Sequence, residues 1–243
     1  MTPFAVLALG FFLGMRHATD SDHVIAVTTI VSRAKSARAA LWIGALWGLG
    51  HSATILTVGG AIVLFGWVIP PRLGLSMEMS VALMLIVLGV MNLIGALEQI
   101  DRVARPHRHH QKHDENAAEH VHASPSITSH PPAAGALRPL FIGVVHGLAG
   151  SAAVALLVLA TIKSASMALV YLAIFGAGTL AGMMLLTFAM ALPISTLSSR
   201  FGSVELLLSR VTGLVSVAFG LFLAYRICIA DGLLLGTPHW APH

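Results

Sequence analysis

Six long apolar stretches, separated by polar segments, form the dominant pattern of this chain. Each stretch is close to or above the roughly 20 residues that an α-helix needs to cross the apolar core of a bilayer. The pattern therefore predicts an all-α integral membrane protein with six transmembrane helices. We expect these helices at residues 3–31, 40–66, 76–98, 139–162, 167–195 and 204–229.

The composition agrees with this prediction. Of the 243 residues, 56% are hydrophobic and 10% are charged, and the mean hydropathy is +0.85. A soluble domain carries about 25% charged residues, so a soluble bundle of these helices would lack a polar surface. The single cysteine, Cys228, excludes an intramolecular disulfide and a Cys-rich metal site. The first residues carry no basic segment or small-residue cleavage site, so we expect them to belong to the mature protein.

Basic residues are distributed unevenly between the segments that connect the predicted helices. If the helices simply alternate in direction, ten of the 14 lysines and arginines fall on one side and two on the other. Cytoplasmic segments carry the excess of Lys and Arg, so both termini are predicted outside the cytoplasmic membrane. The basic residues thus mark topology in a lipid bilayer, and no nucleic-acid partner is expected.

The two halves of the chain carry a faint internal repeat. GMRHATDSDHVIA at 14–26 matches GVVHGLAGSAAVA at 143–155 with an offset of 129, which pairs His17 with His146. Two shorter matches follow in the same order at offsets of 128 and 131. Three helices per half make such repeats inverted in the membrane, with a site expected where they meet. We therefore divide the chain into repeats at 1–98 and 139–243, joined by a cytoplasmic loop at 99–138.

The first repeat contains a polar motif inside its first apolar stretch: Arg16, His17, Asp20, Asp22 and His23. On a continuous helix, His17, Asp20 and His23 would share an arc of about 120°. Asp22 would point nearly opposite Asp20. If the helix breaks at Gly14 or at the acidic residues, that arrangement no longer holds and Asp22 can join the site.

Charged groups at membrane depth cost roughly 2.5–3.5 kcal/mol each and persist where they pair, line a wet path or bind an ion. A self-satisfied cluster, in which Arg16 pairs with an aspartate and the histidines bond to backbone carbonyls, and a proton relay are both physically possible. One arginine does not neutralise two aspartates, however, and a divalent cation would. Imidazole and carboxylate without thiolate suit nickel, cobalt, zinc or copper(II).

Further polar residues lie in the other predicted helices. His51 is the next candidate ligand, and Ser52 and Thr54 add hydroxyl groups beside it. His146 is a candidate ligand from the opposite half. Asn92 could line the path, although a hydrogen bond between helices is favoured for it.

The motifs resemble those of a known family. RHATDSDH resembles the signature of the nickel/cobalt transporter family, often written RHA-x-D-A-D-H, and LGHSATI resembles its Leu-Gly-His-Ser motif. The resemblance implies that the metal path includes His17, Asp20, Asp22, His23 and His51. The classical permeases have eight spans and further acidic motifs in the later half. HGLAGSAA at 146–153 instead resembles a shorter branch of nickel-permease-like and urease-accessory-like membrane proteins.

The loop between the repeats is rich in histidine. Seven histidines lie in residues 107–130, amid Pro, Ser, Ala and acidic residues. This composition predicts a largely disordered segment that acts as a weak metal buffer, or else a linker whose histidines are incidental. The histidines are His107, His109, His110, His113, His120, His122 and His130.

These observations predict a permease that moves Ni²⁺ or Co²⁺ inward, with no bound cofactor. In it, His146 completes or gates the site, and Arg16 holds Asp20 or Asp22 when no metal is bound. No nucleotide-binding loop or H-E-x-x-H motif is present, so neither a pump nor an enzyme is expected. Efflux, copper(I) transport through the ten methionines, and metal delivery to nickel-enzyme maturation factors are the alternatives.

Overall fold

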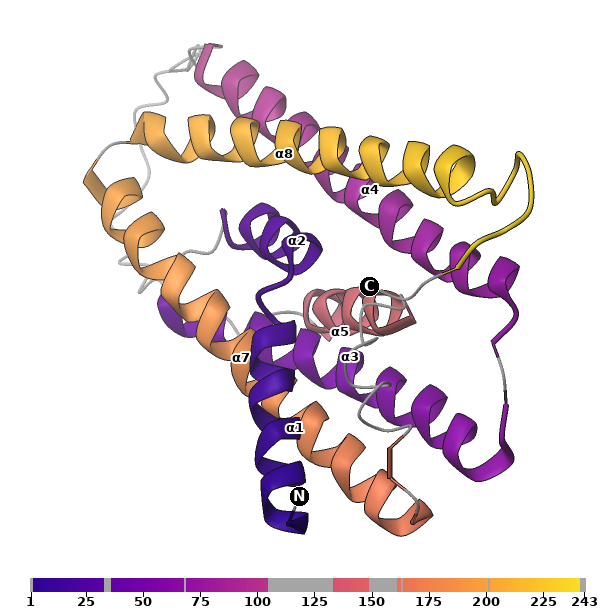
Figure 1. The fold of residues 1–243 in the computed structure, drawn as a ribbon. Helices are drawn as coiled ribbons and strands as arrows, with labels where there is room; N and C mark the ends of the chain where they lie inside the picture. Colours follow the sequence, from indigo (N-terminus) through magenta and orange to yellow (C-terminus); the bar gives the residue numbers. More distant parts are fainter. Residues whose placement is uncertain are drawn as a thin grey trace, which may run out of the picture.

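The computed structural model describes residues 2–32, 36–67, 69–104, 133–148, 161–162, 164–200 and 202–240. Within these ranges the secondary structure is entirely helical (Figure 1). The helices are α1 (Pro3–His17), α2 (Ser21–Val31), α3 (Ala37–Phe65), α4 (Pro71–Ala104), α5 (Ala133–Leu148), α7 (Ala165–Arg200), α8 (Gly202–Tyr225) and the π-helical turn η2 (Arg226–Ala230).

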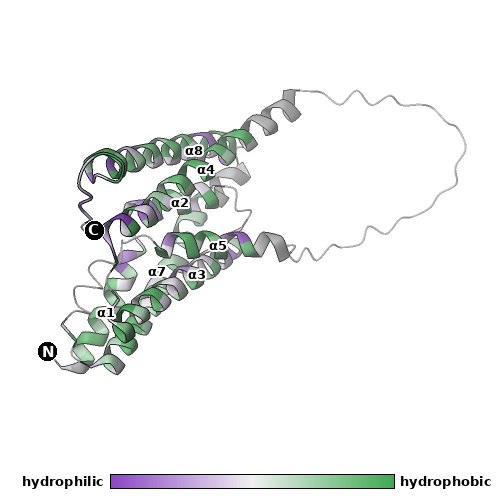
Figure 2. Cartoon of the chain, turned by 90° about the vertical axis from the view of Figure 1, so that its right-hand side faces the viewer, coloured by the Kyte–Doolittle hydropathy of each residue, from purple (hydrophilic) through white to green (hydrophobic). Residues whose placement is uncertain are grey.

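Four helical stretches in the described part are long and apolar enough to cross a membrane, with mean hydropathies between 1.6 and 2.1. They coincide with four of the six predicted spans, and apolar residues run along their length (Figure 2). Large apolar side chains such as Trp42, Leu83 and Leu214 are exposed on them, as expected for surfaces that face lipid. The stretches are Ala37–Phe65, Pro71–Gly95, Ala165–Ile194 and Leu206–Ala230.

The prediction of one continuous helix at 3–31 is wrong, because the chain breaks in the middle of the polar motif. α1 ends at His17 and α2 begins at Ser21, on a different axis (Figure 1). Asp20 precedes α2 with extended backbone angles of φ −62° and ψ 151°. Thr and Asp favour such positions because their side chains compete for backbone hydrogen bonds; the Thr19 hydroxyl donates to the Arg16 carbonyl. At about 1.5 Å per residue, neither piece alone reaches across a ~30 Å core.

Other predicted boundaries also differ from the structure. α4 continues to Ala104, beyond the predicted end at residue 98. α5 already begins at Ala133 and ends at Leu148, so the predicted helix at 139–162 is described only at 139–148 and at residues 161–162, which are not helical. Residues 149–160 and the whole histidine-rich segment lie outside the described residues.

The long helices form two packed pairs, α3 with α7 and α4 with α8 (Figure 1). The shorter helices pack on the first pair: α1 lies along α7, and α5 lies along α3. Glycines permit the close approaches: a Cβ on Gly14 would meet the carbonyl of Phe175, and one on Gly143 would meet the carbonyl of Trp47. The last turns of α1 and α5 are thereby held beside the α3–α7 pair.

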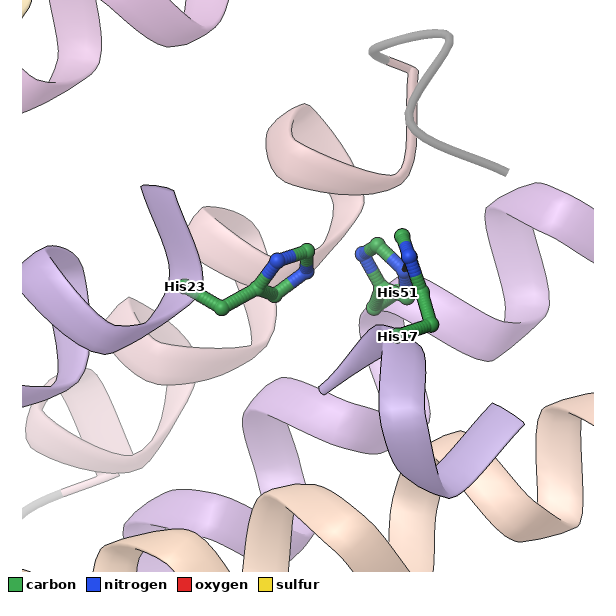
Figure 3. Close-up of side chains that lie close together, drawn as sticks. All are labelled: His17, His23 and His51. Carbon is green, nitrogen blue, oxygen red and sulfur yellow. Dashed lines mark hydrogen bonds between the residues drawn. The ribbon is translucent and has the colours of Figure 1, made fainter. Parts of the chain in front are cut away.

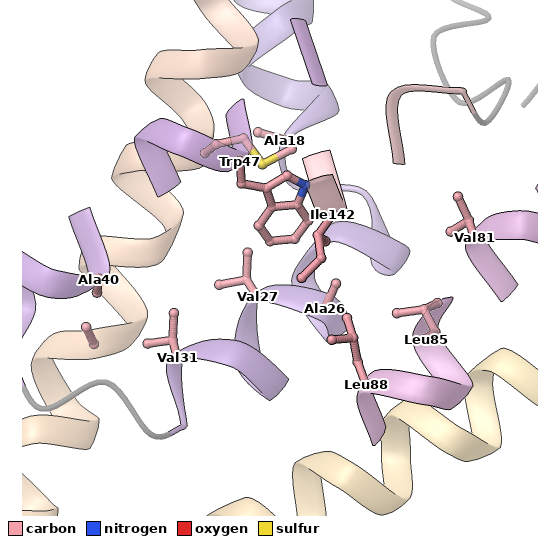
Figure 4. Packing of buried hydrophobic residues seen from close by; sticks show 12 residues of the cluster. Ala18, Ala26, Val27, Val31, Ala40, Trp47, Val81, Leu85, Leu88 and Ile142 are labelled. Atoms are coloured by element: carbon pink, nitrogen blue, oxygen red, sulfur yellow. The ribbon is translucent and has the colours of Figure 1, made fainter. Parts of the chain in front are cut away.

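Helix α2 lies inside the bundle. Its residues Ala26, Val27 and Val31 are fully buried, and they pack in one apolar cluster with Trp47 of α3 and Leu85 of α4 (Figure 4). Burial of this face fixes the rotation of α2 about its axis. The same helix therefore carries His23, in its first turn, into the protein interior.

Candidate metal centre

Four histidines from four helices converge in the interior. His17 ends α1, His23 lies in α2, His51 in α3 and His146 in α5; the first is 5% exposed and the others 0%. The ring of His23 lies 4.7 Å from His17, 5.0 Å from His51 and 4.2 Å from His146, measured between centroids. Figure 3 shows His23 directed toward His17 and His51. The four histidines singled out within the predicted helices are thus brought together.

Asp22 joins this cluster because the helix breaks before it. Its Oδ1 lies 3.2 Å from Nδ1 of His23, and its Oδ2 lies 2.7 Å from Nε2 of His146. Its side chain is 17% exposed. Of the two arrangements that the sequence left open for Asp22, the structure has the one with a broken helix, in which Asp22 joins the cluster.

Asp20 takes a different position from the one a continuous helix would give it. Its Oδ2 lies 2.8 Å from Nδ1 of His17, and its side chain is 42% exposed at the edge of the cluster. An ionised carboxylate accepts a hydrogen bond, so His17 carries its proton on Nδ1 and directs Nε2 inward. That Nε2 lies 2.9 Å from Nε2 of His51. Carboxylates hold metal-binding histidines in this way in many sites.

Several polar atoms of the cluster are buried without a partner. Nε2 of His23, Nδ1 of His51 and Nδ1 of His146 form no hydrogen bond. Leaving a buried polar atom unsatisfied costs about 1–3 kcal/mol, so such atoms are uncommon. Lone pairs on imidazole nitrogen, with one carboxylate, make a donor set that suits a borderline divalent metal ion.

Two groups of three residues bring their ligand atoms within 4.8 Å of one another. One is His17, His23 and His51, and the other is Asp22, His23 and His146. Both contain His23. The described residues therefore offer a nitrogen-only set and a set with one carboxylate side by side.

A cavity of about 340 Å³ adjoins the cluster. Asp22 contributes both to its wall and to the cluster, so the cavity reaches the candidate ligands. Three charged residues outside the motif also line it: Glu78, Arg226 and Asp231. Arg226 Nε lies 3.7 Å from Asp231 Oδ2, and the Trp240 indole donates to Glu78 at 2.8 Å. The sequence patterns did not single these residues out, although Glu78 is an acid at the start of a predicted span.

The residues expected to support the site have structural contacts. Ser52 donates to the Gly176 carbonyl at 2.8 Å, and Thr54 donates to the Val144 carbonyl at 3.2 Å. These bonds tie α3 to α7 and to α5. Arg16 is exposed, and the ion-pair partners described for Asp20 and Asp22 are histidines.

Asn92 lies in a separate polar cluster with Ser32, Ser209 and Thr212. Its Nδ2 donates to Ser32 Oγ at 3.3 Å and to Thr212 Oγ1 at 3.1 Å, and its Oδ1 accepts from Ser209 Oγ at 2.8 Å. These contacts join α4 to α8 and to the end of α2. The expected hydrogen bond between helices is confirmed for Asn92.

Comparison with known proteins matches this chain to one family. The sequence model of the family described as high-affinity nickel-transport protein, NicO, matches residues 4–193. The chain belongs to this family. The resemblance inferred from the RHATDSDH and LGHSATI motifs is thereby confirmed. The NicO family is one of transporters rather than enzymes, and with its apolar helices this member is a multi-pass membrane protein.

A curated relative supports the same assignment. The urease accessory protein UreH of Bacillus sp. (strain TB-90) is 34% identical over 234 residues, which are 94% of each chain. No solved structure matches this chain.

Proposed function

We propose that this NicO-family protein is a permease that carries Ni²⁺, and also Co²⁺, through the cluster of His17, Asp22, His23, His51 and His146. The observation that carries the proposal is the convergence of four buried histidines and one carboxylate, with three ring nitrogens unpartnered. Asp20 orients His17 from the edge of the cluster, and Arg16 lies outside it.

The charge of the cluster supports a divalent cation as its occupant. With neutral imidazoles, the cluster carries one negative charge from Asp22, and Asp20 adds a second at its edge. Charged groups at this depth cost roughly 2.5–3.5 kcal/mol each unless they are compensated. A divalent ion balances both carboxylates, and nitrogen ligands favour nickel and cobalt over magnesium and calcium.

The contrast between two cavities supports uptake as the direction. The cavity beside Asp22 is lined by four carboxylates and one arginine. A second cavity of about 320 Å³, near the end of α2 and the start of α5, is lined by apolar residues with Asn92 and Arg138. The acidic cavity lies toward the start of α4 and the end of α8, the side on which we place the termini and the cell exterior. An acidic mouth concentrates cations on the outer side.

The packing also supports six crossings arranged as inverted repeats in the cytoplasmic membrane. In this arrangement α1 and α2 form one broken crossing, and α5 begins its counterpart. α1 lies on α7 as α5 lies on α3. The close contact of Gly14 with Phe175 corresponds to that of Gly143 with Trp47, at offsets of 129 and 128 residues. Broken helices beside the ion site are common in transporters built from inverted repeats.

The relative's name adds a partner class to this proposal. A protein named as a urease accessory protein suggests that the imported nickel is passed to maturation factors of a nickel enzyme. The histidine-rich segment at 107–130, which we place in the cytoplasm, would hold ions briefly before that transfer. A protein that only delivers metal would bind nickel without raising its cellular content.

Radio-nickel accumulation tests the function directly. Cells that produce the protein should accumulate more nickel than matched cells that produce the His23→Ala variant at equal membrane abundance. Excess cobalt should suppress the difference. Accumulation below that of the variant would indicate export, and equal accumulation would exclude transport through this cluster.

A further inference from the structure

We infer that the cluster holds its ion in two alternative positions that share His23, and that the ion passes from one to the other during transport. The inference rests on the proposed function. The first, the carboxylate position, consists of Asp22, His23 and His146. The second, the nitrogen position, consists of His17, His23 and His51.

Each position contains one hydrogen-bonded pair whose atoms lie close to the spacing that an ion requires. An ion can replace the bonded proton of the pair if that proton moves to the unpartnered Nδ1 of His51 or His146. Two donors bound at about 2.1 Å and at right angles to each other lie about 3.0 Å apart. In the carboxylate position, Asp22 Oδ2 and His146 Nε2 are 2.7 Å apart. In the nitrogen position, Nε2 of His17 and Nε2 of His51 are 2.9 Å apart. The two pairs share no residue, so each can bind an ion without the other.

His23 lies between the two pairs and can serve only one of them at a time. Its Nδ1 is 3.2 Å from Asp22 Oδ1, whereas its Nε2 is buried without a partner. Its ring points toward His17 and His51 (Figure 3). A neutral imidazole has one nitrogen with a free lone pair and one that carries a proton. Occupation of one position through His23 therefore excludes the other, and each chain holds one ion.

The chemistry of the two positions indicates the order in which the ion occupies them. Asp22 lines the acidic cavity, whereas neither His17 nor His51 does. A hydrated cation arriving through the cavity meets the carboxylate of Asp22 first. The negative charge of the carboxylate offsets the free-energy cost of the water ligands that the cation loses. Mg²⁺ and Ca²⁺ prefer oxygen ligands, so they gain little from the next, nitrogen-only position. The second position therefore acts as the filter that selects nickel and cobalt.

Metal binding to the purified full-length protein in lipid nanodiscs tests this arrangement, with Co²⁺ as a spectroscopic probe and Ni²⁺ for stoichiometry. We expect one ion per wild-type chain. His51→Ala should retain one Co²⁺ in the carboxylate position, and His146→Ala should retain one in the nitrogen position. The two variants should differ in their visible absorption spectra, because one site includes a carboxylate and the other does not. Neither should transport, since each lacks one half of the path.

Control variants separate this inference from loss of folding and from failure of the proposed function. His51→Gln and His146→Gln preserve a polar side chain and should give the same pair of spectra, while Thr54→Ser should match the wild type. Two ions per wild-type chain, identical spectra for the two histidine variants, or loss of binding in both folded variants would overturn the two-position arrangement. A wild-type protein that binds neither Co²⁺ nor Ni²⁺ would instead overturn the proposed function.

Discussion

Two buried polar clusters of this protein lie at helix contacts, and they differ in how their hydrogen bonds are completed. In the Asn92 cluster, the amide nitrogen and oxygen both have partners on neighbouring helices. In the histidine cluster, three ring nitrogens have none. A completed network of neutral groups stabilises helix packing. In our proposal, an incomplete network that also contains a carboxylate gains its missing partners from a cation.

The first and strongest test of this contrast is His23→Ala, since His23 belongs to both candidate ligand groups. We expect radio-nickel uptake to fall to the background of cells without the protein. Asn92→Ala is the matched control, because it removes a buried polar side chain of the other cluster and should retain uptake. Normal uptake by a correctly inserted His23→Ala protein would contradict the assignment of the histidine cluster to transport.

Asp22→Asn tests the role of charge at nearly constant size. The amide can still bond to His146, but it provides no negative charge for the ion. We expect nickel affinity, measured by isothermal titration calorimetry in nanodiscs, to fall by at least about 100-fold, more than the loss typical of an outer-sphere partner. An affinity within a few-fold of wild type would show that hydrogen bonding alone defines this cluster.

Asp20→Asn should have a smaller effect, because Asp20 lies at the edge and acts through His17. The asparagine can still accept a hydrogen bond from Nδ1 of His17, although a weaker one. The His17 ring therefore keeps its place, but its Nε2 is less basic. The expected loss of nickel affinity is about 10–100-fold. The same titration measures it, and a loss larger than that of Asp22→Asn would reverse the roles given to the two aspartates.

Asn92→Ala should have the smallest effect on nickel affinity and a clear effect on protein stability. Its removal leaves the Ser209 and Thr212 hydroxyls with fewer partners, at a cost of about 1–3 kcal/mol in the free energy of unfolding. Thermal unfolding followed by tryptophan fluorescence should show a lower Tm, with nickel affinity unchanged. A loss of affinity without a loss of stability would place Asn92 on the ion path, where the second cavity reaches it.

Much of the fold and part of the site were predictable from the sequence. Apolar runs define four of the helices to within a few residues, because a bilayer requires a minimum length of apolar helix. His17, His23, His51 and His146 stand out because ionisable groups are rare in such runs. The break at residues 18–20 was left open as an alternative, since Thr19 and Asp20 favour a helix start only weakly against the apolar sequence around them.

The sequence by itself determined that this is a helical membrane protein with imidazole and carboxylate side chains inside its apolar stretches, because hydropathy and residue chemistry are local properties. Only the tertiary structure decided which aspartate faces which histidine. That choice depends on the turn between α1 and α2 and on the burial of Ala26 and Val27, which set the rotation of α2. The tertiary structure also created the acidic cavity. Its wall joins Asp22 to Glu78, more than 50 positions away, and to Asp231, more than 200 positions away.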